Sequence, residues 1–341
     1  MWRPTASIEA IKYRAQCNRL IRQYFDAREV LEVETPIMSQ YATTDPAIES
    51  FACPQSQILF ESATRYLQTS PEFSMKRLLA AGSGSIYQLC KVFRQEEQGR
   101  WHNPEFTMLE WYRPGMDYHE LMVETGALLQ LLLSSNNKQE IPFIKLSYAE
   151  LFQEYLGLDP HRATHDSFNH IIRAKNIDLN FGLESLSIDA CLQLVQTHLI
   201  EPAMPKQKII CVYDYPSSQA SLAKLASQDE YLVAQRFECF FNGVELANGF
   251  QELTNAKEQQ QRFEQDMAVR VKQKLTEKPY DQALIMAMQH KDGHQGLPEC
   301  SGVAVGLDRV LALGFEMSGC QAPNDNLNSL SSVLAFNFER A

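Results

Sequence analysis

The sequence lacks the signals of secretion, membrane insertion and zinc binding. Its eight cysteines are scattered over 341 residues without a C-x-x-C pair, which favours reduced thiols over a zinc site or a disulfide framework. No signal-peptide segment follows the first residue, and the longest apolar run, around residues 127–133, is too short to cross a bilayer. These absences predict a soluble, cytoplasmic protein without a membrane partner.

Basic residues are also scarce. The chain has 31 Lys and Arg against 42 Asp and Glu, a formal net charge of −11. Because a nucleic-acid backbone attracts a basic surface, this balance argues weakly against a nucleic-acid partner, although a local basic groove could occur within an acidic chain.

Several catalytic motifs are missing too. The sequence contains no H-E-x-x-H and no G-x-S-x-G, and GSGS at 82–85 is not followed by G-K-[ST] as in a P-loop. Any chemistry therefore depends on positioning and electrostatics rather than on a covalent protein intermediate.

Apolar periodicity and capping signals predict one α+β domain over residues 1–341. Strands that do not alternate regularly with helices favour a mainly antiparallel sheet. We expect Ser70 to cap a helix with Pro71 as its first residue and Gly82 just past its end, and a capping box at Asp117. The other expected helices span 7–29, 117–133 and 256–276, with a mostly helical insertion at about 145–205. The expected strands are 30–38, 86–95, 105–112, 208–216, 236–253, 301–313 and 332–338. The segment 301–313 passes into an apolar helix at Arg309.

The strand at 105–112 mixes apolar and charged side chains on one face. Phe106, Met108, Glu110 and Tyr112 alternate along the strand and so point the same way. An unpaired buried carboxylate costs several kcal/mol, by rough estimate, and a solvent-exposed face does not need Phe106 and Met108. A ligand-binding face explains both, with an aromatic for a flat ring and a carboxylate for a cation. The alternative is a half-exposed strand with ordinary cross-strand pairs.

A second stretch repeats this mixture. Asn248, Phe250 and Glu252 share one face of FNGVELANGFQEL, and Glu238 and Glu245 flank it. Two carboxylates can share a hard cation such as Mg²⁺, which keeps waters and substrate phosphates as its other ligands. Alone, the pattern is ambiguous, because glutamates on strands are usually just solvated.

A third stretch, GVAVGLDRV, places only small groups on one strand face. Gly302, Ala304 and Gly306 weaken a strand unless another group approaches its backbone closely. Arg309 follows in the first turn of a helix, where a cation opposes the helix dipole and so indicates an anion such as phosphate. The alternative is small residues for tight helix–strand packing.

Taken in order, these stretches resemble the catalytic core of class II aminoacyl-tRNA synthetases. FRQE…HNPEFTMLEWY is similar to motif 2, GVAVGLDR to motif 3 and EVLEVETPIM to motif 1. The RHNPEFTM-like and NGFxEL-like strings resemble lysyl-tRNA synthetases, and the resemblance covers almost the whole chain. It implies a mainly antiparallel sheet flanked by helices and, since motif 1 lies at a two-fold interface, a homodimer.

The first expected helix starts within about ten residues of Met1, which leaves no room for the N-terminal anticodon-binding barrel of lysyl-tRNA synthetases. A core without the barrel resembles the elongation factor P–(R)-β-lysine ligases, through PEFSMKRLLAAGSGSIYQLCKVFRQEE, YPSSQASLA and ECSGVAVGLDR. This resemblance implies ATP-dependent activation of (R)-β-lysine or lysine as an adenylate, with release of pyrophosphate. Transfer to a lysine amine of elongation factor P would follow, with release of AMP and no role for tRNA.

The resemblance also implies roles for individual residues. Arg94 and Arg309 are expected to be catalytic and to hold the α- and γ-phosphates, and Glu238 and Glu245 to bind Mg²⁺. The other expected ATP-binding residues are Gln95, Glu96, His102, Asn103, Phe106, Glu245, Leu246 and Gly306. The expected amino-acid pocket comprises Ser70, Pro71, Glu72, Glu110, Tyr112, Asn248, Phe250, Glu252 and Ala304.

Two positions depart from the lysyl-tRNA synthetase pattern. Ala304 and Ala247 replace glycines, and we interpret Ala304 as reshaping the pocket for a β-amino acid, since one methyl group is worth about 1 kcal/mol or more in selectivity. Harmless packing is the alternative. The 318–330 loop is longer than expected for the ligase group, and no role is predicted for it.

Three other functions remain open. They are a truncated lysyl-tRNA synthetase that charges tRNA, a ligase for a small molecule, and a non-catalytic regulatory subunit. Regulatory relatives usually lose a motif 2 or motif 3 arginine, whereas Arg94 and Arg309 are both present. The sequence does not distinguish L-lysine from (R)-β-lysine, and it predicts neither the docking surface for the acceptor protein nor the number of Mg²⁺ ions.

Overall fold

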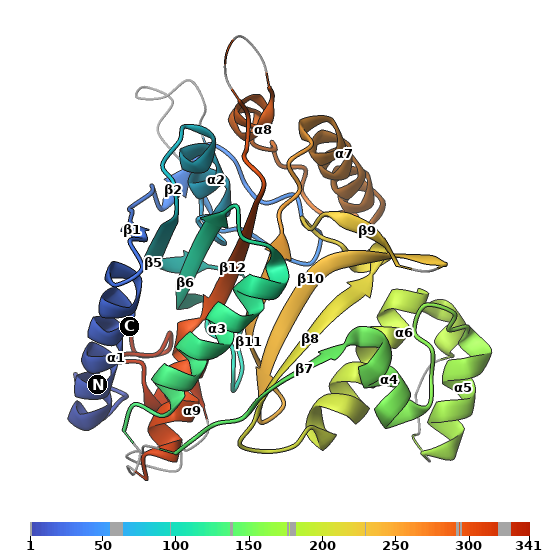
Figure 1. Cartoon of the computed structure of the whole chain (residues 1–341), viewed down its shortest axis with the longest axis horizontal. Helices are drawn as coiled ribbons and strands as arrows, with labels where there is room; N and C mark the ends of the chain where they lie inside the picture. Colours follow the sequence, from blue (N-terminus) through green and yellow to red (C-terminus); the bar gives the residue numbers. More distant parts are fainter. Residues whose placement is uncertain are drawn as a thin grey trace.

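A mixed β-sheet crosses the whole molecule (Figure 1). The computed structural model describes residues 2–54, 64–95, 97–136, 139–175, 177, 182–228, 230–290, 293, 295–319 and 329–341. Within these residues the large sheet has nine strands. In spatial order they are β1 (Leu31–Glu32), β5 (Ile86–Phe93), β6 (Glu105–Pro114), β12 (Cys300–Gly306), β11 (Val244–Gln251), β10 (Tyr231–Phe241), β8 (Ile209–Pro216) and β7 (Phe143–Ser147), with β9 (Leu225–Gln228) paired to β10.

The sheet is mainly antiparallel. Only the outer pairs β1–β5 and β7–β8 are parallel among the described strands, which agrees with the predicted α+β class. A small second sheet has the order β2 (Met38–Ser39), β4 (Thr64–Leu67) and β3 (Ala52–Pro54). The described helices are α1 (Ile8–Asp26), α2 (Glu72–Ala80), α3 (Tyr118–Leu133), α4 (Tyr148–Leu156), α5 (His165–Ala174), α6 (Ile188–Val195), α7 (Ala256–Lys272), α8 (Gln282–Met288) and α9 (Leu307–Met317). None is long and apolar enough to cross a bilayer.

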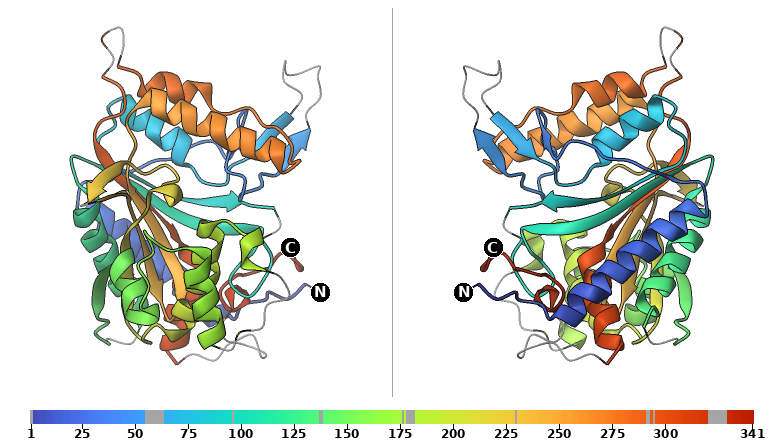
Figure 2. Two further views of the ribbon diagram at one scale, coloured as in Figure 1. Left: turned by 90° about the vertical axis from the view of Figure 1, so that its right-hand side faces the viewer. Right: turned by 90° about the vertical axis from the view of Figure 1, so that its left-hand side faces the viewer.

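Two helix groups cover opposite sides of the central strands (Figure 2). Helices α1, α3 and α9 bury one face, where Leu109 and Trp111 of β6 join the main apolar core. Helices α2, α7 and α8 pack near the other face, where Tyr112 joins a smaller core. Because side chains alternate along β6, residues 106, 108, 110 and 112 all point away from the main core. They face the side on which the cavity described below lies.

The long predicted helices are confirmed with shorter bounds. The expected capping box is present, because the Asp117 side chain accepts from Glu120 N and the Glu120 side chain accepts from Asp117 N. The segment 145–205 begins with the end of β7 and continues with α4, α5 and α6, as expected for a mostly helical stretch. The 236–253 strand is in fact a hairpin of β10 and β11, with Asn242 and Gly243 at positive φ of 55° and 78°, the conformation that two-residue hairpin turns require.

Three further predictions were wrong. The single strand expected at 30–38 is instead two short strands, β1 and β2, which belong to different sheets. Helix α2 begins at Glu72, so Pro71 takes the N-cap position and Ser70 lies one residue before it. The Ser70 hydroxyl still accepts the Glu72 N–H at 3.0 Å. The final strand at 332–338 does not form, and Val333 and Leu334 are buried as neighbours. Its carbonyls instead accept the N–H groups of Thr5 and Ala6. Of the 318–330 loop, residues 320–328 lie outside the described part.

Candidate active site

A cavity of about 1010 Å³ lies against the side of β6, β12, β11 and β10 that is turned away from the main core. It brings together the three stretches singled out in the sequence. The predicted residues on its wall are Ser70, Glu72, Arg94, His102, Asn103, Phe106, Glu110, Tyr112, Glu238, Glu245, Leu246, Asn248, Phe250, Glu252, Ala304, Gly306 and Arg309. Pro71 and Gln95 are not on the wall, and Glu96 lies outside the described residues.

Strand register explains why these side chains meet. Ala304 pairs with Glu110 on one side and with Asn248 on the other. Gly302, two residues earlier, pairs in the same way with Tyr112 and Phe250. Since residues opposite one another in adjacent strands share a face, two rows of side chains from three strands form the floor of the cavity.

The two strand glycines differ in what lies above them. A Cβ on Gly302 would lie 2.3 Å from the Tyr112 ring and 2.4 Å from Oε1 of Glu252, so these side chains occupy the space that glycine leaves. Among the described residues, the atom nearest to a Cβ on Gly306 is Cδ of Arg309, at 3.7 Å. The absence of a side chain at Gly302 therefore makes space for Tyr112 and Glu252. At Gly306 it leaves space beside Arg309.

Glu110 is a buried carboxylate without an ion pair among the described residues. It is 2% exposed and accepts hydrogen bonds from Ser70 Oγ at 2.7 Å and Tyr112 Oη at 2.6 Å. Burial, and next the charge of Glu72, raise its pKa to about 8. A cation bound nearby stabilises the ionised form of such a carboxyl group. The geometry therefore suits an ammonium group in the cavity.

Glu72 and Glu252 complete the acidic end of the cavity, and both pair with Lys76. The Lys76 ammonium lies 2.5 Å from Glu72 Oε1 and 2.6 Å from Glu252 Oε2. Burial chiefly raises the pKa of Glu252, to about 7, while Lys76 acts in the opposite direction. Lys76 was not among the predicted site residues. Its position four residues after Glu72 on a helix indicates that pair, but its contact with Glu252 depends on tertiary packing.

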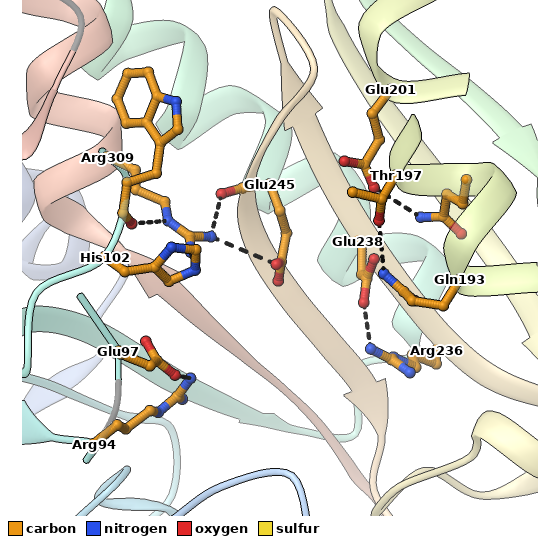
Figure 3. Close-up of polar contacts among 12 residues, drawn as sticks. Arg94, Glu97, His102, Gln193, Thr197, Glu201, Arg236, Glu238, Glu245 and Arg309 are labelled. Atoms are coloured by element: carbon orange, nitrogen blue, oxygen red, sulfur yellow. Dashed lines mark hydrogen bonds and ion pairs between the residues drawn. The ribbon is translucent and has the colours of Figure 1, made fainter. Parts of the chain in front are cut away.

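Arg309 lines the cavity beyond the Met108–Gly306 pair, away from Glu252, and polar contacts hold it there (Figure 3). Its guanidinium donates to the carbonyls of Trp101 at 3.1 Å and Glu245 at 2.9 Å, and it lies 2.8 Å from Nε2 of His102. Burial, and next the charge of Arg309, lower the pKa of His102, which favours the neutral ring that can accept from Arg309. Fixed in this way, Arg309 is preorganised to meet an anion.

Arg94 provides the second cation of this end. Its guanidinium carbon lies 5.2 Å from the centre of the Phe106 ring, and Nε donates to Thr69 O at 3.3 Å. A carboxylate, Glu97, lies 3.4 Å from its Nη1 (Figure 3). Arg94, Phe106 and Arg309 thus place two cations and an aromatic ring on one wall, a set suited to phosphates and a planar base.

The two predicted metal ligands have different surroundings. Glu238 is buried, ion-paired with Arg236, and accepts the Tyr215 hydroxyl at 2.7 Å. The Glu245 side chain is 40% exposed, with Arg309 at 3.5 Å. Burial raises the pKa of Glu238, and although Arg236 acts against this, the charge of Glu245 adds to it. The two carboxylates repel each other, and a cation bound between them would reduce this repulsion.

A third carboxylate lies in the same region, on the side of the helical insertion (Figure 3). Burial, followed by the charge of Glu238, raises the pKa of Glu201 to about 7. Within the described ranges, however, no three His, Cys, Asp or Glu side chains are arranged to hold a metal together. The donor set thus fits a cation that takes one or two carboxylates and completes its shell with water and phosphate, as Mg²⁺ does.

Asp308 is a further residue that the sequence analysis missed. It is buried beside Arg309, accepts the Thr107 N–H at 2.7 Å and pairs with Arg14 at 2.5 Å. These bonds connect the first turn of α9 to β6 next to Phe106. Asp308 thereby fixes the distance between the arginine and the aromatic ring, a role that requires knowledge of which strand α9 packs against.

The comparisons with known proteins agree with this geometry. Residues 1–319 match the family model described as tRNA synthetases class II (D, K and N). The chain is 44% identical over 344 residues to a protein of Pectobacterium carotovorum subsp. carotovorum named elongation factor P–(R)-β-lysine ligase, covering 100% of this chain and 98% of that one. It is 46% identical over 347 residues, with the same coverage, to a protein of that name from Salmonella dublin. The chain belongs to the class II tRNA synthetase family and, within it, to the group of elongation factor P–(R)-β-lysine ligases.

Proposed function

We propose that the protein activates (R)-β-lysine with ATP and transfers it to a lysine side chain of elongation factor P. The relatives that carry this name match the whole chain. The observation that carries the proposal is the separation of charge within one cavity. Along the strands, Arg94 lies beyond the Phe93–Glu105 pair and Arg309 beyond the Met108–Gly306 pair. Glu110 and Glu252 lie toward the opposite end, where Lys76 joins Glu252 to Glu72. A polyanion and a diammonium amino acid can occupy such a cavity together.

The first step joins the two substrates. A carboxylate oxygen of the amino acid attacks the α-phosphorus of ATP, the bond from that phosphorus to the bridging oxygen breaks, and pyrophosphate leaves. Arg94 and Arg309 stabilise the charge on the phosphates, while Glu110 and Glu252 hold the ammonium groups and so fix the position of the carboxylate.

The second step needs no protein nucleophile. A neutral lysine amine of elongation factor P attacks the carbonyl carbon of the adenylate, AMP leaves with the electrons of the broken C–O bond, and the amine loses its proton. The product is an amide on the acceptor protein.

Glu238 and Glu245 are the residues that would hold Mg²⁺. Their oxygen-only donor set and mutual repulsion support this assignment. Mg²⁺ bound there would neutralise phosphate charge. Glu245 is the more accessible of the two, whereas Glu238 already pairs with Arg236 and Tyr215.

The protein is also proposed to be a homodimer. Leu31 on the edge strand β1, with Ile37 and Met38 nearby in the chain, is exposed although apolar, which suits an interface between two copies. Sedimentation velocity at micromolar concentration is expected to give a dimer, and a monomer would contradict this part of the proposal.

Amino-acid-dependent ATP–pyrophosphate exchange tests the activation step. It is run with (R)-β-lysine, with L-lysine and without amino acid, and the strongest exchange is expected with (R)-β-lysine. Transfer is then compared between elongation factor P and tRNA. A preference for L-lysine with transfer to tRNA would instead identify a truncated lysyl-tRNA synthetase, and no exchange with any amino acid would leave a regulatory subunit.

A further inference from the structure

The acidic end of the cavity contains a cation that does not line the ligand space. Lys76 follows Glu72 by four residues on α2, and its side chain is 1% exposed. Its ammonium contacts Glu72 and Glu252 at 2.5 and 2.6 Å. Glu72 and Glu252 belong to the cavity wall, whereas Lys76 does not. A molecule in the cavity therefore meets the two carboxylates, while Lys76 contacts them from behind.

The third carboxylate has no such partner in the part of the chain that the structure describes. Glu110 receives only the hydroxyl hydrogen bonds of Ser70 and Tyr112 among the described residues. With Glu72, Glu110 and Glu252 ionised, Lys76 compensates one of their charges and two remain uncompensated. The amino acid of the proposed reaction carries two ammonium groups. The charge of Lys76 thus makes the acidic end match a diammonium ligand.

Because Glu252 is buried, the charge balance at this end of the cavity depends on Lys76. Glu252 is 1% exposed and its pKa is already about 7, mainly through burial, with Lys76 opposing the rise and Glu72 adding to it. Burial also acts to lower the pKa of Lys76, but the charges of Glu252 and Glu72 outweigh it and raise that pKa instead. A buried carboxylate that loses its counter-ion takes up a proton rather than stay ionised. Without Lys76, Glu252 would lose the ionised form that binds a cation, and Glu72 would lose the partner that holds it in place.

We propose that Lys76 is a positioning residue for amino-acid recognition, which holds Glu72 and Glu252 in place and compensates one of the three carboxylates, so that the cavity offers two uncompensated negative charges to two ammonium groups. This inference rests on the proposed function, since the diammonium substrate gives the charge balance its purpose. Lys76 acts through the two carboxylates and not on the reacting atoms. Its loss is therefore expected to affect binding of the amino acid and to spare binding of ATP.

Two variants and one control isolate this role. Lys76→Met removes the charge at similar volume, and Lys76→Gln keeps hydrogen-bond donors without the charge, so it also serves if Lys76→Met does not fold. The control is Lys278→Met, which removes another buried lysine that pairs with a carboxylate, Glu49. Glu49 keeps Arg270 as a partner at 2.7 Å, and Lys278 is not on the cavity wall. Circular dichroism establishes that each protein is folded.

The KM values for (R)-β-lysine and for ATP are measured by pyrophosphate exchange between about pH 6 and about pH 8.5. Loss of a charged interaction predicts a KM for the amino acid raised on the order of 10- to 100-fold near pH 7 in both Lys76 variants, with the KM for ATP within about twofold. In the variants, Glu252 must lose a proton before it binds an ammonium group, so the increase is expected to shrink as pH rises. Lys278→Met is expected to change neither KM. Equal increases in both KM values, or an increase that does not depend on pH, would assign Lys76 a purely structural role.

Calorimetric titration with (R)-β-lysine separates this inference from the proposed function. If the wild-type protein binds (R)-β-lysine but shows no exchange, only the proposed reaction is contradicted, and the Kd values of the Lys76 variants decide the inference. If the wild-type protein does not bind (R)-β-lysine, both are overturned.

Discussion

Glu110 is expected to lower the stability of the fold although it is proposed to bind the amino acid. Burial raises its pKa from 4.5 to about 8, and each unit of pKa difference is worth about 1.4 kcal/mol. Because the folded-state pKa is raised, the Glu110 carboxyl group does not lower the free energy of unfolding below about pH 4.5. It lowers that free energy progressively as pH rises and has its full effect above about pH 8. At pH 7 the cost is roughly 3 kcal/mol of the free energy of unfolding.

Glu110→Gln removes the charge and keeps the shape of the side chain. In urea unfolding without substrate, we expect this variant to be more stable than the wild-type protein by roughly 4 kcal/mol near pH 8 and to lose most of this advantage near pH 5. Its KM for (R)-β-lysine is expected to rise on the order of 10- to 100-fold, because a charged hydrogen bond is lost.

Glu105→Gln is the matched control on the same strand. The Glu105 side chain is 47% exposed and lies 3.5 Å from Lys91, so its replacement is expected to change stability by less than about 1 kcal/mol at either pH. A Glu110→Gln variant that is less stable than wild type at pH 8, or a stability difference that does not vary with pH, would refute the assigned cost of Glu110.

Three further predictions concern other parts of the cavity. Gly302→Ala is expected to destabilise the protein by about 1–3 kcal/mol in urea unfolding, because its Cβ would overlap Tyr112 and Glu252. A loss no larger than that of Gly306→Ala, where a Cβ has 3.7 Å of clearance, would contradict this. Arg309→Lys is expected to raise the KM for ATP about 10-fold or more and to spare that for the amino acid, since lysine cannot reproduce the guanidinium bonds; equal changes in both would argue against a phosphate role. Chelation by EDTA is expected to abolish exchange until Mg²⁺ is restored, and Glu245→Gln to raise the Mg²⁺ concentration for half-maximal exchange about 10-fold; an unchanged Mg²⁺ requirement would remove Glu245 from the metal site.

Alternation along single strands was enough to predict much of the cavity. Phe106, Met108 and Glu110 were expected on one face of a strand, and all three line the cavity. Strand periodicity is local and does not depend on the neighbouring strands, so these positions could be predicted from the sequence. The same holds for the capping box at Asp117, whose two hydrogen bonds lie within four residues.

Features that depend on tertiary packing were not predictable. A lysine four residues after a glutamate on a helix is usually solvated, and only the placement of α2 against the end of β11 buries Lys76 against Glu252. The expected strand at 332–338 failed for a related reason. Val333 and Leu334 are buried as neighbours rather than in alternation, because this segment packs around the start of the chain.

The carboxylate partners of the two arginines have a consequence for how anions enter the cavity. Arg94 lies beside Glu97, and Arg309 lies beside Glu245. When a phosphate binds, each arginine exchanges a carboxylate partner for the phosphate. Fewer ions are therefore released to solvent than if both arginines were unpaired before binding. The affinity for ATP should therefore fall only weakly with ionic strength. Simple anions such as sulfate, which arrive without a cation for Glu245, should compete poorly with nucleotide.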